Sequence, residues 1–376
     1  MRAILLLSQL LLSLSAPPCP CANASFCKRV APPPRLEIFQ FQVAPSNWPF
    51  YDWSALTTVA LFGGTGPEAL AGVCHGHSKN VRMVAGAPLS NEPADLRNSS
   101  YLDAFIDALL ATVNGSALGV ELDGVNFDVE GPLSGADADA LTAAVAKTAA
   151  AVKRAFGAGF QVSVDVAWSP ECIDGRCYDF KGLADASDLL FVMAYDMRSQ
   201  IKPPAPCVAS ANSPFPGVQE GLMAFERIGV PASKLVLGLP WYGYRYPCLP
   251  GTAPDAVVCP ITHVPFRNVS CSDAAGREFC FADVKRLLRN GTSRPYTWDA
   301  DLAAPTFNRV EGADATVQYW FDDPRSLALK VEYARAQGLR GVGSWNVDCL
   351  AYNSSDPIER EDTIAMWEAM ARFRQP

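Results

Sequence analysis

Residues 123–130, with the sequence DGVNFDVE, place polar side chains at alternate positions of a run that otherwise has the composition of a buried strand. Successive side chains of a strand point to opposite faces, so Asn126, Asp128 and Glu130 share one face and the apolar residues between them share the other. Burying two carboxyl groups beside an amide costs several kcal/mol unless they bond to one another or to a ligand. Burial beside a like charge also raises the pKa of a carboxyl group, as a general acid requires. The pattern therefore predicts a catalytic site, although a single carboxylate here could simply cap the next helix.

Two other apolar runs end in polar or aromatic residues that could contact a ligand with a polar ring. The run FVMAYD at positions 191–196 ends in Met193, Tyr195 and Asp196. The run GVGSW at positions 341–345 places small residues before Trp345, which leaves room for the indole to lie flat across a site. Buried Tyr and Trp side chains also serve in packing, so a structural role is the alternative for both. Asp165 is a polar residue inside an apolar run and could face the same site.

Short apolar runs alternate with Ala- and Leu-rich stretches of helical spacing, which is the pattern of βα units around a parallel sheet. Eight parallel strands predict an α/β fold, the (β/α)8 TIM barrel, whose catalytic groups lie at the carboxyl ends of the strands. Glu130 comes just after the fourth run, where this rule places a catalytic residue. A doubly wound sheet is the alternative, but the sequence lacks its Gly-rich phosphate-binding turn. The eight runs are Leu36–Val43, Thr57–Phe62, Val81–Ala85, Gly124–Asp128, Phe160–Val166, Leu189–Tyr195, Leu235–Leu239 and Gly341–Trp345.

The segments between these runs support the same fold. Residues 101–113 and 136–156 have helical spacing, and residues 324–337 end before Gly338, as a helix with a glycine cap does. The seventh and eighth runs are separated by about a hundred residues, far more than one helix needs. We therefore predict a small α+β insertion at about residues 245–321, between the seventh strand and the helix that follows it.

The DGVNFDVE octet resembles the DGxDxDxE signature of family 18 glycoside hydrolases, the chitinases and their relatives, with Asn126 where most of the family carries Asp. The FVMAYD run resembles the M-x-Y-D of the sixth strand in that family. Residues 238–243, GLPWYG, resemble the P-x-Y-G of its seventh strand, but this chain has Tyr244 where many chitinases have Arg. The role of that Arg toward substrate is therefore in doubt here. The family commonly carries a lobe where we predict the insertion.

The resemblance implies a role for each of these residues. Glu130 would be the general acid, and the acetamido oxygen of the substrate would be the nucleophile, because this family is a substrate-assisted exception among glycosidases. Asp128 would orient the acetamido group, and Tyr195 and Asp196 would contact it and the neighbouring hydroxyls. Trp345 would form the floor beneath the scissile sugar. Asn126 is expected to bond to Asp128 and, being uncharged, to let that carboxyl ionise more readily than two aspartates would.

Two further segments resemble one exo-acting member of the family, the WSP after the fifth run and VPF-R-x-x-x-CSDAAGR at residues 264–277. This resemblance implies a lysosomal enzyme that releases the reducing-end GlcNAc from the chitobiose core of free N-linked oligosaccharides, by cleaving a β-1,4 bond. A secreted endo-chitinase would share every catalytic residue. A non-catalytic chitin-binding lectin is the third possibility, but such lectins usually lack the acid, and Glu130 is present.

The first residues indicate the secretory pathway. Residues 1–16 have an Arg, an apolar run and then small residues, which is typical of a signal peptide. A Cys- and Pro-rich leader at residues 17–34 precedes the catalytic domain, residues 35–376. All twelve cysteines follow the signal peptide, so six disulfides are possible, and Cys172 with Cys177 is close enough for a local loop. We predict a lysosomal protein, or alternatively an extracellular one. Glycosylation is predicted at six sequons, at Asn23, Asn98, Asn114, Asn268, Asn290 and Asn353.

Charge and composition narrow the class of partner. The net charge of −8 argues against nucleic acid, whose phosphates need a basic surface, and favours a neutral, sugar-like ligand. No run after residue 16 is long and apolar enough to span a membrane. A metal site at Cys74, His75 and His77 is the weaker alternative for that cluster, since the paired ligands of a metal motif are missing. We expect a monomer that needs neither metal nor cofactor.

Overall fold

The computed structural model describes residues 18–30, 36–200, 206–267, 269–312 and 314–375. The expected signal peptide at residues 1–16 and the sequon at Asn268 lie outside these residues. Among the helices that are described, none combines the length and the apolar character needed to cross a membrane.

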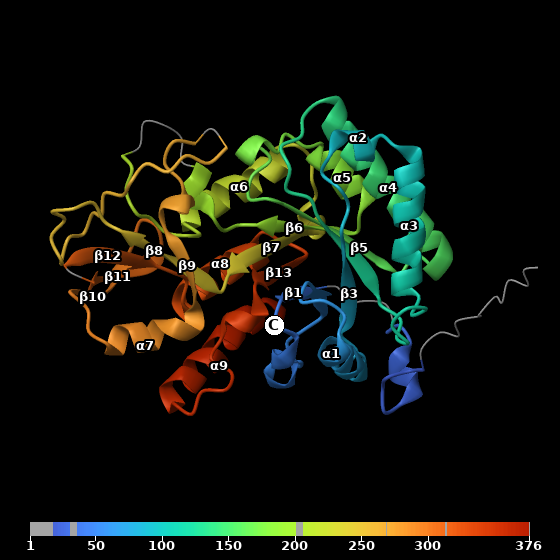
Figure 1. Ribbon diagram of the computed structural model, residues 1–376, viewed down its shortest axis with the longest axis horizontal. Coiled ribbons are helices and arrows are strands. Elements are labelled where there is room, and N and C mark those ends of the chain that lie inside the picture. Colours follow the sequence, from blue (N-terminus) through green and yellow to red (C-terminus); the bar gives the residue numbers. More distant parts are fainter. Residues whose placement is uncertain (1–17, 31–35, 201–205, 268, 313, 376) are drawn as a thin grey trace, which may run out of the picture.

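Eight parallel strands close into a barrel in the order β1-β13-β7-β6-β5-β4-β3-β2, which confirms the predicted TIM barrel (Figure 1). Each strand ends within two residues of its predicted run. Close packing inside the barrel requires glycine at Gly238, where a Cβ atom would lie 2.3 Å from the ring of Phe191. The barrel strands are β1 Glu37–Gln42, β2 Thr58–Leu61, β3 Arg82–Ala87, β4 Gly124–Asp128, β5 Gln161–Ala167, β6 Leu189–Met193, β7 Leu235–Pro240 and β13 Gly341–Trp345.

Four of the helices that surround the barrel, α3, α5, α8 and α9, begin at a residue whose side chain accepts from a free backbone N–H group. Asn98 accepts hydrogen bonds from the first turn of α3, and Asp323 forms a capping box with Ser326 at the start of α8. Gly338, with φ of 67°, follows the end of α8, in agreement with the predicted glycine cap. These helices are α1 Pro67–Ser78, α2 Pro93–Leu96, α3 Ser99–Val113, α4 Ala136–Phe156, α5 Phe180–Ala186, α6 Phe215–Arg227, α8 Pro324–Ala336 and α9 Pro357–Ala371.

The inserted segment forms a separate antiparallel sheet with one helix. The sheet has the order β10-β11-β12-β8-β9, and we call it, with α7, the lobe. It begins at Tyr242, three residues before the predicted start, because the chain leaves β7 and enters β8 across Trp241 alone. Figure 1 shows the lobe at one end of the molecule, on the side opposite to α3 and α4. Its elements are β8 Tyr242–Pro247, β9 Arg277–Cys280, α7 Val284–Arg289, β10 Arg294–Asp299, β11 Ala304–Glu311 and β12 Ala315–Trp320.

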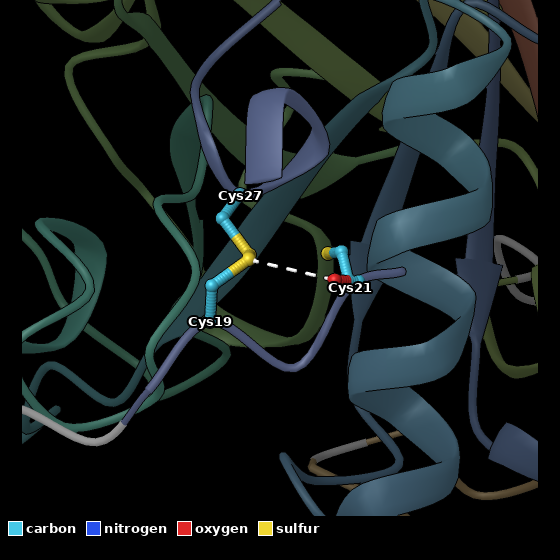
Figure 2. Close-up of side chains that lie close together, drawn as sticks. All are labelled: Cys19, Cys21 and Cys27. Carbon is cyan, nitrogen blue, oxygen red and sulfur yellow. Dashed lines mark hydrogen bonds between the residues drawn. A yellow bond between two sulfur atoms is a disulfide. The ribbon is translucent and has the colours of Figure 1, made fainter. Parts of the chain in front are cut away.

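All twelve cysteines are paired in six disulfides, including the predicted local loop between Cys172 and Cys177. Two disulfides fasten the N-terminal segment, one of them to α1 through Cys74. Figure 2 shows the sulfur atoms of Cys19, Cys21 and Cys27 close together, but each belongs to a disulfide and is not available as a thiolate ligand. The other pairs are Cys207–Cys271, Cys248–Cys259 and Cys280–Cys349.

The histidines beside Cys74 have structural partners. His77 contacts the carbonyl oxygen of Phe26 through Nδ1 at 2.7 Å and Asp123 through Nε2 at 2.9 Å, both in a buried setting. The ring of His75 packs 5.1 Å from that of Trp48 and 5.2 Å from that of Trp53. Because Cys74 lies in a disulfide, this cluster holds the N-terminal segment and α1 against the barrel and does not form the alternative metal site.

Candidate active site

Asn126, Asp128 and Glu130, in β4 and just after it, become more exposed to solvent toward the mouth of the barrel. Asn126 is fully buried, Asp128 is partly buried, and the side chain of Glu130 is 51 % exposed just after the strand ends. Asp123, the first residue of the octet, has a structural role, since it accepts hydrogen bonds from the N–H groups of Met83 and Val30. The strand therefore places Asp128 and Glu130 where a ligand could reach them.

Asn126 bonds to the neighbouring strand and not to Asp128, contrary to our expectation. Its Nδ2 donates to Asp165 Oδ2 at 2.6 Å, and its Oδ1 accepts from Ser163 Oγ at 2.6 Å. Asp165 is the register partner of Asp128 across β4 and β5, so the two side chains point to the same face. Position 126 of β4 thus has an amide where most of the family has a carboxyl group, and the neighbouring strand β5 supplies a carboxyl group at Asp165.

The buried carboxyl groups are Asp128 and Asp165. Burial raises the pKa of Asp128 to about 7, and the charge of Glu130 adds to this effect, whereas Arg176 opposes it. Burial also raises the pKa of Asp165, and the charge of Asp128 contributes. Neither Oδ1 atom has a hydrogen-bond partner among the described residues. Burial and the charge of Glu130 therefore favour a protonated Asp128 in the unliganded protein, and its comparison with a site of two aspartates stays a prediction.

Glu130 is paired with an arginine that the sequence analysis did not identify. Arg176 Nη1 lies 2.9 Å from Glu130 Oε2, and its Nη2 lies 3.2 Å from Asp174 Oδ2. Arg176 is buried to 7 % exposure and comes from the loop that the Cys172–Cys177 disulfide closes. The ion pair fixes the side chain of Glu130 beside the disulfide loop. The short cysteine spacing revealed this loop in the sequence, but nothing local showed where its arginine would point.

Residues at the end of β6 meet the beginning of the lobe. The carboxyl group of Asp196 accepts hydrogen bonds from the hydroxyls of Tyr242 and Tyr244, and its backbone N–H donates to Asn212 Oδ1 at 2.7 Å. Burial raises the pKa of Asp196 to about 7, although the tyrosine hydrogen bonds favour the charged form. Burial also raises the pKa of Tyr195, so its hydroxyl stays protonated and can donate. Tyr244, which replaces the Arg of many chitinases, is thus a partner of Asp196.

Two cavities adjoin the carboxyl groups, and we refer to the two together as the cleft. The first has a volume of about 320 Å³ and extends from the barrel to the lobe. Its lining residues are Glu130, Asp174, Arg176, Met193, Tyr195, Asp196, Tyr244, Phe266, Arg267, Asp273 and Ala274. The second has a volume of about 350 Å³ and is lined by Asn126 and Asp128 together with the ends of β2 and β3, the loops after them, Thr112 of α3 and Leu122. Four of the predicted site residues therefore share the first cavity, and two share the second.

Trp345 and Asp165 lie beside these cavities and line neither of the two as described. The ring of Trp345 packs 5.5 Å from Phe41 and 5.8 Å from Phe62, which lines the second cavity. Asp165 is buried behind Asn126. Trp345 is thus placed at the edge of the cleft, whereas Asp165 is placed to act through its neighbours and not on a ligand.

The predicted glycosylation sites are accessible where the structure describes them. Asn23, Asn98, Asn114, Asn290 and Asn353 are all exposed. The Oδ1 atom of Asn98 caps α3, which leaves its amide nitrogen free for a glycan. Their occupancy stays a prediction.

A closed parallel barrel with carboxyl groups at the end of its fourth strand is the architecture of a glycoside hydrolase, and comparison with known proteins gives the family. Residues 95–349 match the family model described as glycosyl hydrolases family 18. The chain belongs to this family, which confirms the resemblance that the octet showed, and it is a glycosidase.

The relatives cover nearly the whole chain. Di-N-acetylchitobiase from Mus musculus is 41 % identical over 97 % of this chain and 96 % of its own length. Di-N-acetylchitobiase from Homo sapiens is 39 % identical over 94 % of this chain and 88 % of its own length. Among solved structures, a mutant class V chitinase from Nicotiana tobaccum in complex with NAG4 has a TM-score of 0.66 at 18 % identity. It covers 88 % of this chain and 98 % of its own, and it supports the fold.

Raised carboxyl pKa values predict that this protein is more stable in acid than at neutral pH. Unfolded Asp128 and Asp196 would ionise near the ordinary pKa of 3.8, whereas the folded protein holds their protons up to about pH 7. The folded state therefore binds more protons between these values, and the free energy of unfolding falls as pH rises through this window, by about 1.4 kcal/mol per pKa unit for each group. Thermal unfolding followed from pH 4 to pH 8 should show a falling midpoint. The slope should lessen in Asp196→Asn but not in the surface variant Asp103→Asn, and a midpoint that climbs toward pH 8 would contradict this.

Proposed function

We propose that this chain is an exo-acting, retaining glycosidase that releases the reducing-end GlcNAc from the chitobiose core of free N-linked oligosaccharides. The observation that carries the proposal is the position of Glu130, which follows the end of β4 two residues after Asp128 and lines one cavity with Tyr195 and Asp196. Near-full-length similarity to proteins named di-N-acetylchitobiase supports the substrate. A neutral GlcNAc-containing oligosaccharide also suits an acidic protein better than an anionic ligand does.

Glu130 is the general acid. When substrate enters, its carboxyl group leaves Arg176, takes up a proton from solvent, turns toward the oxygen of the scissile β-1,4 bond and protonates the leaving sugar. Arg176 stays fixed by Asp174 within its disulfide loop, so the guanidinium remains available to the hydroxyls of the leaving sugar. After the leaving sugar departs, Glu130 as a carboxylate takes a proton from the water that opens the intermediate.

The substrate's acetamido oxygen is the nucleophile, and Asp128 holds this group. The oxygen forms a bond to the anomeric carbon as the glycosidic bond breaks, which gives a cyclic oxazolinium ion and retention after water attacks. With a pKa of about 7, Asp128 carries a proton in the free protein at acidic pH. Positive charge on the acetamido group favours the carboxylate, so Asp128 ionises as the charge develops and stabilises it. Tyr195, Asp196, Met193 and Trp345 bind the sugar around this centre.

Asp165 is a positioning residue. It takes the place of the aspartate that most of the family carries at the position of Asn126. Its Oδ1 is buried in register with Asp128, so the two carboxyl groups can share one proton, which moves onto Asp165 as Asp128 ionises. Asn126 fixes the other oxygen of Asp165 through the 2.6 Å hydrogen bond. We therefore replace the expected substrate contact of Asp165 with this indirect role.

Exchanging Asn126 and Asp165 tests the positioning role of Asp165. Asp165→Asn should lower kcat by about tenfold or more, since no second carboxyl remains beside Asp128. The double variant N126D/D165N should recover most of that loss, because Ser163 and the new amide on β5 can then both donate to the new carboxylate on β4, with a coupling of about 1–3 kcal/mol in the double-mutant cycle. Initial rates across pH 4–8 for wild type, the two single variants and the double variant measure this. Additive losses in the double variant would show that Asp165 acts only in packing.

The proposed site of action is the lysosome, reached through the secretory pathway. Six disulfides suit an oxidising route, and exposed sequons suit a glycosylated protein. The expected fall in stability as pH rises from about 4 to about 7 would suit an acidic compartment. An extracellular monomer is the alternative, and microscopy of the tagged full-length protein with a lysosomal marker distinguishes the two.

The product profile on chitooligosaccharides labelled at the reducing end tests the function. The proposed enzyme hydrolyses diacetylchitobiose and releases labelled GlcNAc alone from longer chains. Early release of labelled chitobiose or chitotriose would instead support a secreted endo-chitinase. Binding without any hydrolysis would support a chitin-binding lectin.

A further inference from the structure

The lobe reaches the barrel mouth through a narrow turn at Phe266 and Arg267, which we call the tip. The N–H of Phe266 donates to Val269 O at 2.9 Å, and the N–H of Val269 donates to Phe266 O at 2.8 Å. Arg267 has φ of 42°, the left-handed conformation that short hairpin turns use. These bonds hold Phe266 and Arg267 at the start of a tight turn.

The tip bonds to the backbone of Glu130, the residue that carries the catalytic acid. Arg267 Nη1 donates to the carbonyl oxygen of Glu130 at 2.8 Å, although the two residues are 137 positions apart in the sequence. The guanidinium group lies 5.1 Å from the centre of the Phe266 ring, so the two side chains stack. Both line the cavity of Glu130 and Tyr195. The tip is thus the wall of this cavity on the lobe side.

The base of the tip is braced, so the wall exists before substrate binds. The Cys207–Cys271 disulfide joins the segment to the loop after β6. Ser272 Oγ donates to Val264 O at 2.7 Å across the base, and the Tyr246 hydroxyl donates to buried Asp273 at 2.5 Å. A wall fixed in this way excludes a ligand group without any cost of ordering a loop.

The position of the tip limits the sugars that can follow the scissile bond. Glu130 protonates the oxygen between two sugars, and the reacting sugar lies against Asp128, Tyr195 and Asp196, so we place the leaving sugar between Glu130 and the tip, in the part of the cavity that Phe266 and Arg267 line. The cavity there measures about 320 Å³, at the lower end of the range of about 300–1,000 Å³ for ligand pockets. A chain that continued past the leaving sugar would meet Arg267.

We propose that the tip closes the cleft one sugar beyond the scissile bond, so that Phe266 and Arg267 restrict hydrolysis to the terminal reducing-end GlcNAc. The inference rests on the proposed function and assigns its exo specificity to two residues. A glycosidically linked group on the reducing-end sugar, such as asparagine, would collide with the tip. Free oligosaccharides would fit.

The test compares wild type with Arg267→Ala, the double variant F266A/R267A and the control R286A, which removes an exposed arginine of α7 in the same lobe. Substrates are end-labelled chitopentaose, diacetylchitobiose and the same disaccharide linked to Asn. We expect wild type and R286A to release labelled GlcNAc alone and to leave the Asn-linked substrate intact. The tip variants should release labelled chitobiose and chitotriose as early products and should cleave the Asn-linked substrate about 10- to 100-fold faster than wild type.

Two outcomes separate this inference from the proposed function. If wild type does not hydrolyse diacetylchitobiose, the proposed function fails, whatever the variants do. If wild type hydrolyses it and the folded tip variants, judged by their unfolding midpoints, still release labelled GlcNAc alone and still reject the Asn-linked substrate, the proposed function stands and the role of the tip is overturned.

Discussion

Glu130→Gln is expected to lower kcat by about 10²–10⁴-fold while leaving the affinity for diacetylchitobiose largely intact, because the amide preserves shape but has no proton to transfer. The amide oxygen can still accept from Arg176, so the side chain should keep its place at the cleft. Initial rates and calorimetric titration with the disaccharide measure the two quantities.

The matched control is Glu332→Gln, which removes an exposed carboxylate of α8 that pairs with Arg372, outside the cleft. It should turn over at the wild-type rate. Wild-type turnover by Glu130→Gln would remove Glu130 from the chemistry altogether, whereas loss of binding together with loss of turnover would make it a binding residue.

Asp128→Ala is expected to lose activity on the order of 10²-fold or more, since the acetamido group is no longer held in its attacking geometry and a misplacement of ~1 Å alone has such a cost. Loss of the developing carboxylate adds to the effect. Asp128→Asn keeps the shape but cannot ionise, so it should be nearly as inactive as the alanine variant. Steady-state rates for both, with Asp103→Ala as the surface control, give the comparison.

Changes in the substrate test the same step, the attack by the acetamido oxygen. A disaccharide with glucose or glucosamine in place of the reacting GlcNAc lacks the nucleophile and should not turn over. A thiazoline analogue of the oxazolinium ion should inhibit competitively. Hydrolysis of the glucosamine substrate at a rate near that of diacetylchitobiose would show that Asp128 does not act by holding an acetamido nucleophile.

The barrel strands could be predicted because each carries its own local signal. Buried parallel strands are short, apolar and bounded by polar residues, so β4 and β13 match their predicted runs at both ends. The alternation of Asn126, Asp128 and Glu130 gave their shared face for the same reason. The lobe was located by the excess length between β7 and β13, but its first strand was missed, because β8 follows β7 almost without a break.

The pairing of side chains between distant segments could not be read in this way. Arg176 reaches Glu130 from a disulfide loop, and Arg267 reaches it from the lobe, so both positions depend on how the segments pack. The hydrogen bond from Asn126 to Asp165 could be predicted from the sequence only in part. Adjacent strands in a barrel bring Asp165 beside Asp128, but the direction in which the amide of Asn126 turns depends on Ser163 as its second partner.

The central claim is that the substrate's acetamido oxygen displaces the leaving sugar, and the stereochemistry of the first product tests it most directly. Proton NMR of triacetylchitotriose hydrolysis follows the anomeric signals of the new reducing end before mutarotation mixes them. Participation by the acetamido group predicts that the chitobiose product first appears as the β-anomer and drifts slowly toward the equilibrium mixture. First appearance of the α-anomer would mean direct attack by water with inversion, and would contradict the account.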